Sequence, residues 1–212
     1  MTKLLLDRRA LLVAGAASVA LSACSSIIGP PEPPPIYLLR PPLPPAGGGG
    51  RVGWQMSIVL PEAPDSLDTN RIVLQQADGT MDFYANAEWQ DRLSLLVQSA
   101  LLDAFQASNR IAAVARDTDG LKSDYLLQTD IRDFEAVYET ADTAPSAVVR
   151  IQARLVGVRS SAIVKSLEAR AETAADANTV AAVVAAMNQT LGTTMTQIVG
   201  WALATPAPVR ES

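Results

Sequence analysis

The spacing of apolar positions changes along the chain, and it predicts strands, then a helix, then strands again. Residues 88–108 carry apolar side chains at three- and four-residue spacings, which is typical of a helix with one face in a core, and Asn109 is its expected stop. The Asp78-Gly79 pair predicts a turn. Short apolar and β-branched runs predict strands at residues 54–60, 70–74, 81–84 and 111–115.

Three longer segments alternate between apolar and polar side chains, which is the period of a strand with one buried face. Residues 141–145 and 157–161 between them contain hairpin turn residues, so we expect an antiparallel sheet with one wet face. The apolar positions are Tyr125, Leu127 and Ile131, then Val149, Ile151, Ala153 and Leu155, then Ile163, Leu167, Ala169 and Ala171.

A second amphipathic helix is predicted near the C-terminus, with Asp176 or Asn178 as its cap. Its apolar stripe contains Val180, Val184, Met187, Leu191, Met195, Ile198 and Trp201. Two helices covering one face of an antiparallel sheet make an α+β fold, and we expect it to occupy residues 51–204 as a single domain, followed by a disordered tail at 205–212.

The N-terminus is typical of a signal peptide, residues 1–23, that is removed on export. Basic residues precede the uncharged run 10–21, which is too short to cross about 30 Å of hydrocarbon as a helix. The run ends in Leu21-Ser22-Ala23-Cys24, which resembles the bacterial lipobox. We therefore expect signal peptidase to recognise the first three of these residues, and Cys24, the only cysteine, to be acylated and to anchor the chain on a bilayer.

Two further features concern the membrane in which the protein is retained and the route by which it is exported. Ser25 follows the cysteine where retention in the inner membrane of many Gram-negative bacteria calls for Asp, so the lipobox resemblance points to the outer membrane and its periplasmic face. The pair Arg8-Arg9 loosely resembles a twin-arginine signal, although an ordinary basic region of a general export signal is favoured.

A proline- and glycine-rich tether is expected at residues 24–50. Nine of the fourteen prolines lie in residues 30–45, and an unbroken glycine run follows at 47–50. Residues 36–39, Ile-Tyr-Leu-Leu, interrupt the prolines with an apolar patch. We interpret this patch as a short edge strand docked on the domain, with a sticky linker segment as the alternative.

Composition excludes most enzyme classes. The 212 residues contain no histidine and one cysteine, which removes Ser-His triads, His-containing zinc sites and internal disulfides. The formal net charge of −5 disfavours nucleic acid as a partner. We therefore predict a non-catalytic protein without cofactor or metal.

Two acidic groups do not change this prediction. Asp117, Asp119 and Gly120, with Asp124 beyond them, suggest a calcium loop, but the third carboxylate before the glycine and the closing Glu of an EF-hand are missing, so a solvated turn is favoured. The second group lies in a proline-containing loop without an identifiable nucleophile, and a polar loop accounts for it. It consists of Glu62, Asp65 and Asp68.

The wet face of the long strands is the candidate binding surface. Gln128, Arg132, Arg150 and Arg154 point to the same side of the predicted sheet and could contact a partner protein. Cross-strand ion pairs are the ordinary explanation for charges in this pattern.

Segments spread over nearly the whole chain after Cys24 also carry a family resemblance. They are Ile36-Tyr37-Leu38-Leu39, Asp82-Phe83-Tyr84-Ala85-Asn86-Ala87-Glu88-Trp89, Ser123-Asp124-Tyr125-Leu126-Leu127-Gln128-Thr129-Asp130-Ile131, Phe134-Glu135, Ala153-Arg154-Leu155-Val156 and Ile198-Val199-Gly200-Trp201-Ala202. Together they resemble the ABC-type transport auxiliary lipoproteins. This resemblance implies a non-catalytic periplasmic lipoprotein of an intermembrane lipid-transport system of the MCE type, working with an MCE-domain protein, a permease and an ATPase.

Alternative functions stay open. The chain could be a structural or assembly lipoprotein that partners an outer-membrane protein, or its domain could itself carry lipid; assembly as a homo-oligomer is compatible with each. Neighbouring permease, ATPase and MCE genes would favour transport, whereas a gene for an outer-membrane barrel would favour assembly.

The lipobox generates the first testable prediction. A Cys24→Ala protein should lose acylation and leave the membrane fraction, because the acyl chains on that thiol are the expected anchor. Metabolic labelling with a fatty-acid analogue, followed by fractionation, measures both effects. Continued labelling of the variant would contradict the assignment.

Overall fold

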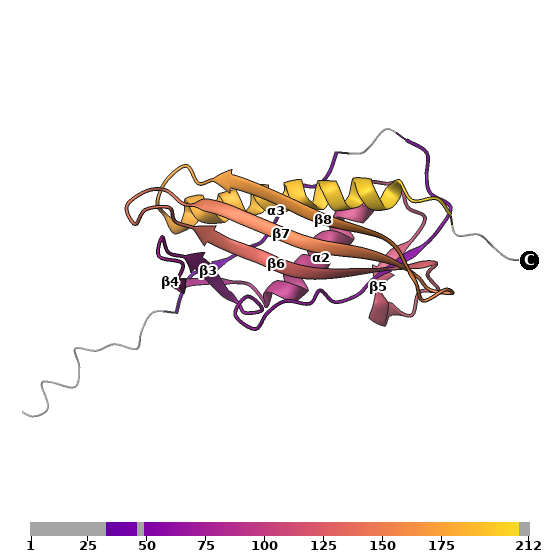
Figure 1. The fold of residues 1–212 in the computed structure, drawn as a ribbon, viewed down its shortest axis with the longest axis horizontal. Coiled ribbons are helices and arrows are strands. Elements are labelled where there is room, and N and C mark those ends of the chain that lie inside the picture. The colour runs from indigo at the N-terminus through magenta and orange to yellow at the C-terminus, as the bar shows by residue number, and fades with distance from the viewer. Residues whose placement is uncertain (1–32, 46–48, 208–212) are drawn as a thin grey trace, which may run out of the picture. The chain divides into compact units, whose positions relative to one another are not determined.

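A mixed sheet and two long helices make up the part of the chain that the computed structural model describes, residues 33–45 and 49–207 (Figure 1). The signal peptide, Cys24 and the end of the expected C-terminal tail lie outside these residues. The chain divides into two compact units, Met1–Pro34 and Pro35–Ser212, and the fold described below belongs to the second. This unit includes the proline-rich residues 35–45, which the sequence analysis assigned to the tether.

The elements follow one another in the order β, β, β, β, α, β, β, β, β, α, with a short 3₁₀ turn at Asp117–Asp119. The strands before the first helix are β1 (Ile36–Tyr37), β2 (Met56–Ile58), β3 (Arg71–Gln75) and β4 (Met81–Trp89). The remaining elements are α2 (Leu93–Ala107), β5 (Val114–Arg116), β6 (Tyr125–Val137), β7 (Ser146–Gly157), β8 (Ile163–Ala174) and α3 (Val180–Leu203).

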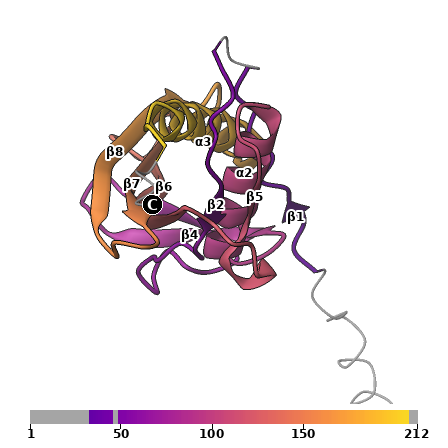
Figure 2. The same ribbon diagram turned by 90° about the vertical axis from the view of Figure 1, so that its right-hand side faces the viewer.

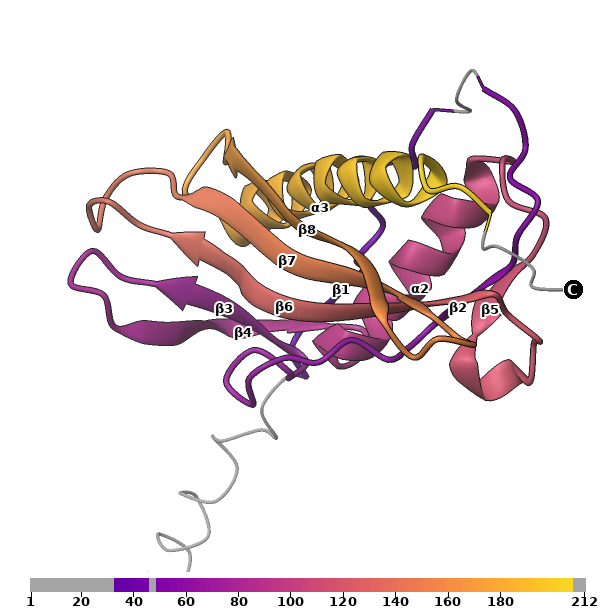
Figure 3. The ribbon, with the colours of Figure 1, turned by 45° about the vertical axis from the view of Figure 1, so that its right-hand side comes forward.

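Strand β6 is the centre of the sheet. One of its edges pairs with β7 in antiparallel register along almost its whole length, and β8 pairs with β7. The other edge is shared: the start of β6 pairs with β2, where Met56 lies opposite Tyr125, and the end pairs with β3, where Leu74 lies opposite Ala136. The sheet therefore forks on one side of β6 (Figure 3).

The fold class α+β predicted from the sequence is confirmed. The long strands are antiparallel as expected, and so are β3 and β4. The sheet is mixed, however, because β2 and β3 run parallel to β6, β5 runs parallel to β2, and β1 runs parallel to β4. Strands of two to five residues carry no sequence pattern that reveals their direction.

Both helices lie on the same side of the sheet (Figure 2). Helix α3 packs against β7 and β8, and helix α2 packs against β2, β5 and α3. The inward side chains of strands and helices form one core, in which Trp54, Phe105 and Phe134 are among the largest fully buried residues. The other face of β6, β7 and β8 stays open to solvent, as the alternating pattern predicted.

Helix α2 begins later than predicted, at Leu93 instead of residue 88. Glu88 and Trp89 belong to β4 because β1 and β3 pair with them: Ile36 lies opposite Glu88, Tyr37 opposite Trp89, and Arg71 opposite Glu88. Trp89 is buried in the core from the strand, so its apolar position matched the helical period by coincidence. The expected stop is confirmed, since Asn109 adopts a left-handed φ of 51° just after the helix.

The N-terminus of α2 is capped from a distant loop. Its own flanking residue, Arg92, makes no side-chain cap; instead the Asp68 carboxylate accepts a hydrogen bond from the Ser94 N–H at 3.0 Å. Burial alone would raise the pKa of the Asp68 carboxyl, but the hydrogen bonds from Ser94 and from the Arg92 guanidinium outweigh it and hold the pKa below its ordinary value. Asp68 is therefore a structural carboxylate.

The cap of α3 differs from the expectation. Thr179 is the N-cap, and its Oγ1 accepts from the Ala182 N–H at 3.3 Å. Asn178 instead accepts a hydrogen bond from the Tyr138 hydroxyl at 2.8 Å, so tertiary contacts place it one residue outside the cap. The middle of the predicted apolar stripe, Met187 to Ile198, is buried as expected.

The second prediction concerns Asp68. Replacing it with Ala should lower the free energy of unfolding by about 1 kcal/mol at neutral pH, because α2 loses its cap. The pKa of Asp68 is lower in the folded than in the unfolded chain, so the stabilisation is complete above pH ~4 and is lost as the pH falls through the folded pKa. Urea unfolding of wild type and variant between pH 7 and pH 3 measures this.

Asp65→Ala is the matched control, since Asp65 lies in the same loop and is exposed. Equal stability losses for the two variants at pH 7, or a difference that does not shrink at low pH, would contradict the capping role.

Candidate functional site

The open face of the sheet brings together the residues that the sequence proposed as a binding surface. Gln128 of β6 lies opposite Arg154 of β7, and Arg150 of β7 lies opposite Asp133 of β6. Arg132 lies between them at a register shift, a β-bulge between Ile131 and Asp133. All four predicted residues therefore lie on the two central long strands.

The bulge rearranges the polar face. Because Arg132 is an extra residue in β6, the alternation shifts by one, so that Phe134 and Ala136 stay in the core while Asp133 and Glu135 turn outward. A strict alternation through 132 would have put Phe134 on the wet face. The bulge thus places a second carboxylate, that of Asp133, next to the arginines of β7.

Asp130 is the anchor of the first charge cluster. Its carboxylate, only 7% exposed as a residue, accepts hydrogen bonds from Arg132 at 3.1 Å and from Arg154 at 3.2 Å. The two guanidinium groups are more exposed than the carboxylate that holds them. They carry one positive charge more than Asp130 neutralises, at a fixed position.

Asp133 anchors the second cluster. The Arg150 guanidinium donates from Nε to Oδ2 at 2.6 Å and from Nη2 to Oδ1 at 3.0 Å, which is a bidentate pair. Hydrogen bonding to Asp133 raises the pKa of Arg150 further, while burial raises the pKa of Glu135 beside it. Cross-strand ion pairs therefore account for Arg150 and Arg154 of β7, whereas Arg132 pairs with Asp130 within β6.

Two small hollows lie beside the first cluster. Residues 59–64 run along β6, where the Glu62 N–H donates to the Thr129 carbonyl at 2.9 Å and the Ile131 N–H donates to the Glu62 carbonyl at 2.7 Å. A cavity of about 400 Å³ between this segment and the arginines is lined by Glu62, Asp130, Arg132 and Arg154, among others. Gln128 lines an adjoining cavity of about 80 Å³. Carboxylates and guanidinium groups facing one hollow can bind polar groups of a partner, and they supply no activated nucleophile.

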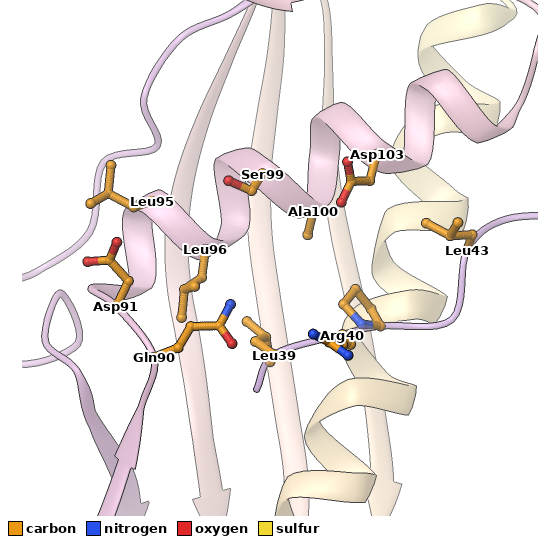
Figure 4. Close-up of a pocket in the computed structure, with 11 residues that line it drawn as sticks. Leu39, Arg40, Leu43, Gln90, Asp91, Leu95, Leu96, Ser99, Ala100 and Asp103 are labelled. Atoms are coloured by element: carbon orange, nitrogen blue, oxygen red, sulfur yellow. The ribbon is translucent and has the colours of Figure 1, made fainter. Parts of the chain in front are cut away.

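A third hollow, the α2 groove, lies on the helical side of the molecule. It is a space of about 510 Å³ between residues 39–43 and helix α2 (Figure 4). Leu39 and Leu96 are buried at its floor, whereas Leu43 and Leu95 are exposed. Its remaining lining includes Arg40 from the proline-rich segment and, from α2 and the turn before it, Gln90, Asp91, Ser99 and Asp103.

The sequence did not reveal this groove, because it assigned the proline-rich residues to a tether. Asn188 of α3 holds the segment: its Oδ1 accepts from the Arg40 N–H, and its Nδ2 donates to the Leu38 carbonyl at 3.5 Å. A Cβ built at Gly192 would lie 2.6 Å from the Pro42 Cγ, so only glycine lets the segment pass so close to α3. The apolar pair Leu38-Leu39 within the proline-rich stretch was the one feature of the sequence that indicated contact between this segment and the domain.

The acidic residues considered as a calcium loop serve separate local roles. The Asp119 carboxylate accepts from the Arg116 N–H at 2.9 Å, and the Asp124 carboxylate accepts from the Gln55 N–H at 3.0 Å. Gly120 provides the turn with a φ of +74°. Within residues 33–45 and 49–207, no group of acidic side chains is arranged to hold a metal ion.

Comparison with known proteins decides the family. Residues 37–199 match the model of the ABC-type transport auxiliary lipoprotein component. The chain belongs to this family. The name of the family describes a lipoprotein that serves as an accessory of a transporter. None of the helices in the described ranges is long and apolar enough to cross a membrane.

Solved structures agree with the family assignment. A crystal structure of a protein from Xanthomonas campestris is 30% identical and covers 80% of this chain and 94% of its own, with a TM-score of 0.74. A second crystal structure, of an uncharacterized protein, is 15% identical, covers 79% of this chain and 98% of its own, and shares the fold with a TM-score of 0.62. No curated protein is significantly similar to this chain.

The third prediction tests whether Asp130 organises the arginines of this auxiliary lipoprotein. An Asp130→Asn protein should fold and lose about 1 kcal/mol of unfolding free energy, because one of the two acceptor oxygens becomes an NH₂ donor and the negative charge that pairs with both arginines is removed. Urea unfolding measures the loss. Asp142→Asn, in the exposed loop between β6 and β7, is the control and should show no change; equal values for both variants would contradict the role of Asp130.

Proposed function

We propose that this chain is a non-catalytic auxiliary lipoprotein that docks an MCE-type intermembrane lipid-transport complex at the outer membrane. In this proposal acylated Cys24 anchors the chain on the periplasmic face. The MCE-domain protein, together with its permease and ATPase, is the partner. The family assignment of residues 37–199 as a transport auxiliary component is the observation that carries the proposal.

The open face of β6 and β7 is the proposed docking surface. Arg150 and Arg154 are about one-third exposed, and carboxylates that belong to the same sheet hold them in place. Side chains fixed in this way lose little conformational entropy when a partner binds. Arginine is also enriched at protein interfaces, where its planar group binds carboxylates and backbone carbonyls. An acidic or carbonyl-rich patch of the partner fits this surface.

The α2 groove favours a second candidate, a domain that carries lipid. Its volume of about 510 Å³ lies within the usual range for small-molecule pockets, and leucines line its floor. Its charged lining residues are Arg40, Asp91 and Asp103, however, so the groove carries one net negative charge, which disfavours the phosphate of a phospholipid. Docking is therefore the favoured function.

The fourth prediction tests docking. The wild-type protein should co-purify with the MCE-domain protein from membranes extracted with mild detergent. Arg150→Glu with Arg154→Glu should abolish the association, because the reversed charges face the partner and also repel Asp133 and Asp130. Arg51→Glu with Lys122→Glu, two exposed positions outside β6 to β8, is the control and should retain it.

Three results would change the assignment. Co-purification with an outer-membrane barrel and not with an MCE protein would support the assembly alternative. Phospholipid bound to the purified protein by mass spectrometry, without a protein partner, would replace docking by lipid carriage. Loss of association in the control variant as well would remove the open face from the interface.

A further inference from the structure

The tip of the β7–β8 hairpin exposes aliphatic side chains. Val158, Ile163 and Val164 are 42%, 58% and 45% exposed, although a hairpin tip is usually polar. Val158 directly follows β7, and Ile163 and Val164 are the first residues of β8, so all three lie at the same end of this hairpin, which we name the hairpin tip (residues 157–165).

The tip is an ordered turn. The Gly157 N–H donates to the Ala162 carbonyl at 2.9 Å, and the Ser161 N–H donates back to the Gly157 carbonyl at 2.9 Å. Ser161 has a φ of 52°, and the Ser160 hydroxyl lies against Gly157. The backbone of the turn is thus fixed by hydrogen bonds, and Val158 and Ile163 on either side of it are exposed.

The charges of the hairpin tip are all positive. Arg159 and Lys165 are its charged residues, and no acidic residue occurs between Gly157 and Leu167, in a chain whose net charge is −5. Neither cation takes part in an ion pair within the described residues 33–45 and 49–207. The acid beside the tip, Asp124, already accepts a hydrogen bond from the Gln55 N–H.

An aromatic ring from α3 completes the group. The Lys165 ammonium lies 5.7 Å from the centre of the Trp201 ring, and Trp201 is partly exposed. Aliphatic side chains, cations and a tryptophan are the residue types that proteins place at the boundary between lipid headgroups and acyl chains.

We propose that the hairpin tip contacts a membrane surface that carries anionic phospholipid. Val158, Ile163 and Val164 enter the headgroup region, and Arg159 and Lys165 meet the lipid phosphates. A second protein fits this projection less well, since a stable interface buries about 800 Å² on each partner and a small convex tip offers little of that area. A fluid lipid surface adapts to the projection.

This contact is independent of the proposed docking to a transport complex. A lipoprotein already lies near a bilayer, so the weak attraction of a few side chains is enough to orient its body against the surface. Contact at the hairpin tip would then determine the direction in which the open face of β6 and β7 points relative to the membrane.

The fifth prediction places a probe at the tip of the full acylated protein in vesicles. An environment-sensitive fluorophore on Ile163→Cys should shift to shorter wavelength and be quenched by a lipid-borne spin label in vesicles of phosphatidylcholine and phosphatidylglycerol. Met81→Cys, at a similarly exposed position of 47% at the start of β4, is the matched control and should show neither effect.

Charge reversal tests the anionic lipid. Arg159→Glu with Lys165→Glu should remove the response at residue 163, since each cation near an anionic surface contributes about a fivefold increase in association, and vesicles of phosphatidylcholine alone should give a weaker response. Lipid-borne quenchers should also reduce the tryptophan fluorescence. This loss reports on Trp201, which is partly exposed beside the tip, because Trp54 and Trp89 are buried.

Three outcomes would overturn the proposal. Labels at residues 163 and 81 could respond equally in vesicles. The response at residue 163 could persist unchanged after both charge reversals. It could also require an added envelope protein, in which case the hairpin tip is a site for a protein partner.

Discussion

The hydrogen bonding of β6 is the constraint on which the rest of the fold depends. Its 13 residues pair on one edge with β7 and on the other with both β2 and β3. The branch that contains β3, β4 and β1 and the branch that contains β2 and β5 meet at this strand. The two helices then cover the inward face of the sheet that β6 holds together. A shorter β6 could not pair with both branches.

The same strand determines the character of the open face. Asp130 lies before the bulge and Asp133 after it, so β6 presents two carboxylates to the arginines of β7. Each guanidinium is held by a neighbour in the sheet and keeps donors free for a partner. The surface is therefore both stable in the free protein and ready for binding, which suits the docking role proposed for it.

The edge strand β8 shows how the chain limits unwanted pairing. The Gln197 amide of α3 donates to the Arg170 carbonyl at 3.1 Å and accepts from the Arg170 N–H at 3.2 Å. A side chain from the covering helix thus takes the place of a neighbouring strand at this position. Alternation of residues along β8 identified it as a strand, but no local pattern could show that Gln197, 27 residues away, protects its edge.

Local periodicity was enough to predict the long strands, most of both helices, the α+β class and the side of the sheet on which the four proposed binding residues lie. Those features depend on side chains two to four residues apart, which the sequence shows directly. The parallel pairing of short strands, the cap of α2 by Asp68, the bulge that turns Asp133 outward and the α2 groove all join residues that are distant in the chain. Their energies come from contacts that exist only after folding, so the tertiary structure alone reveals them.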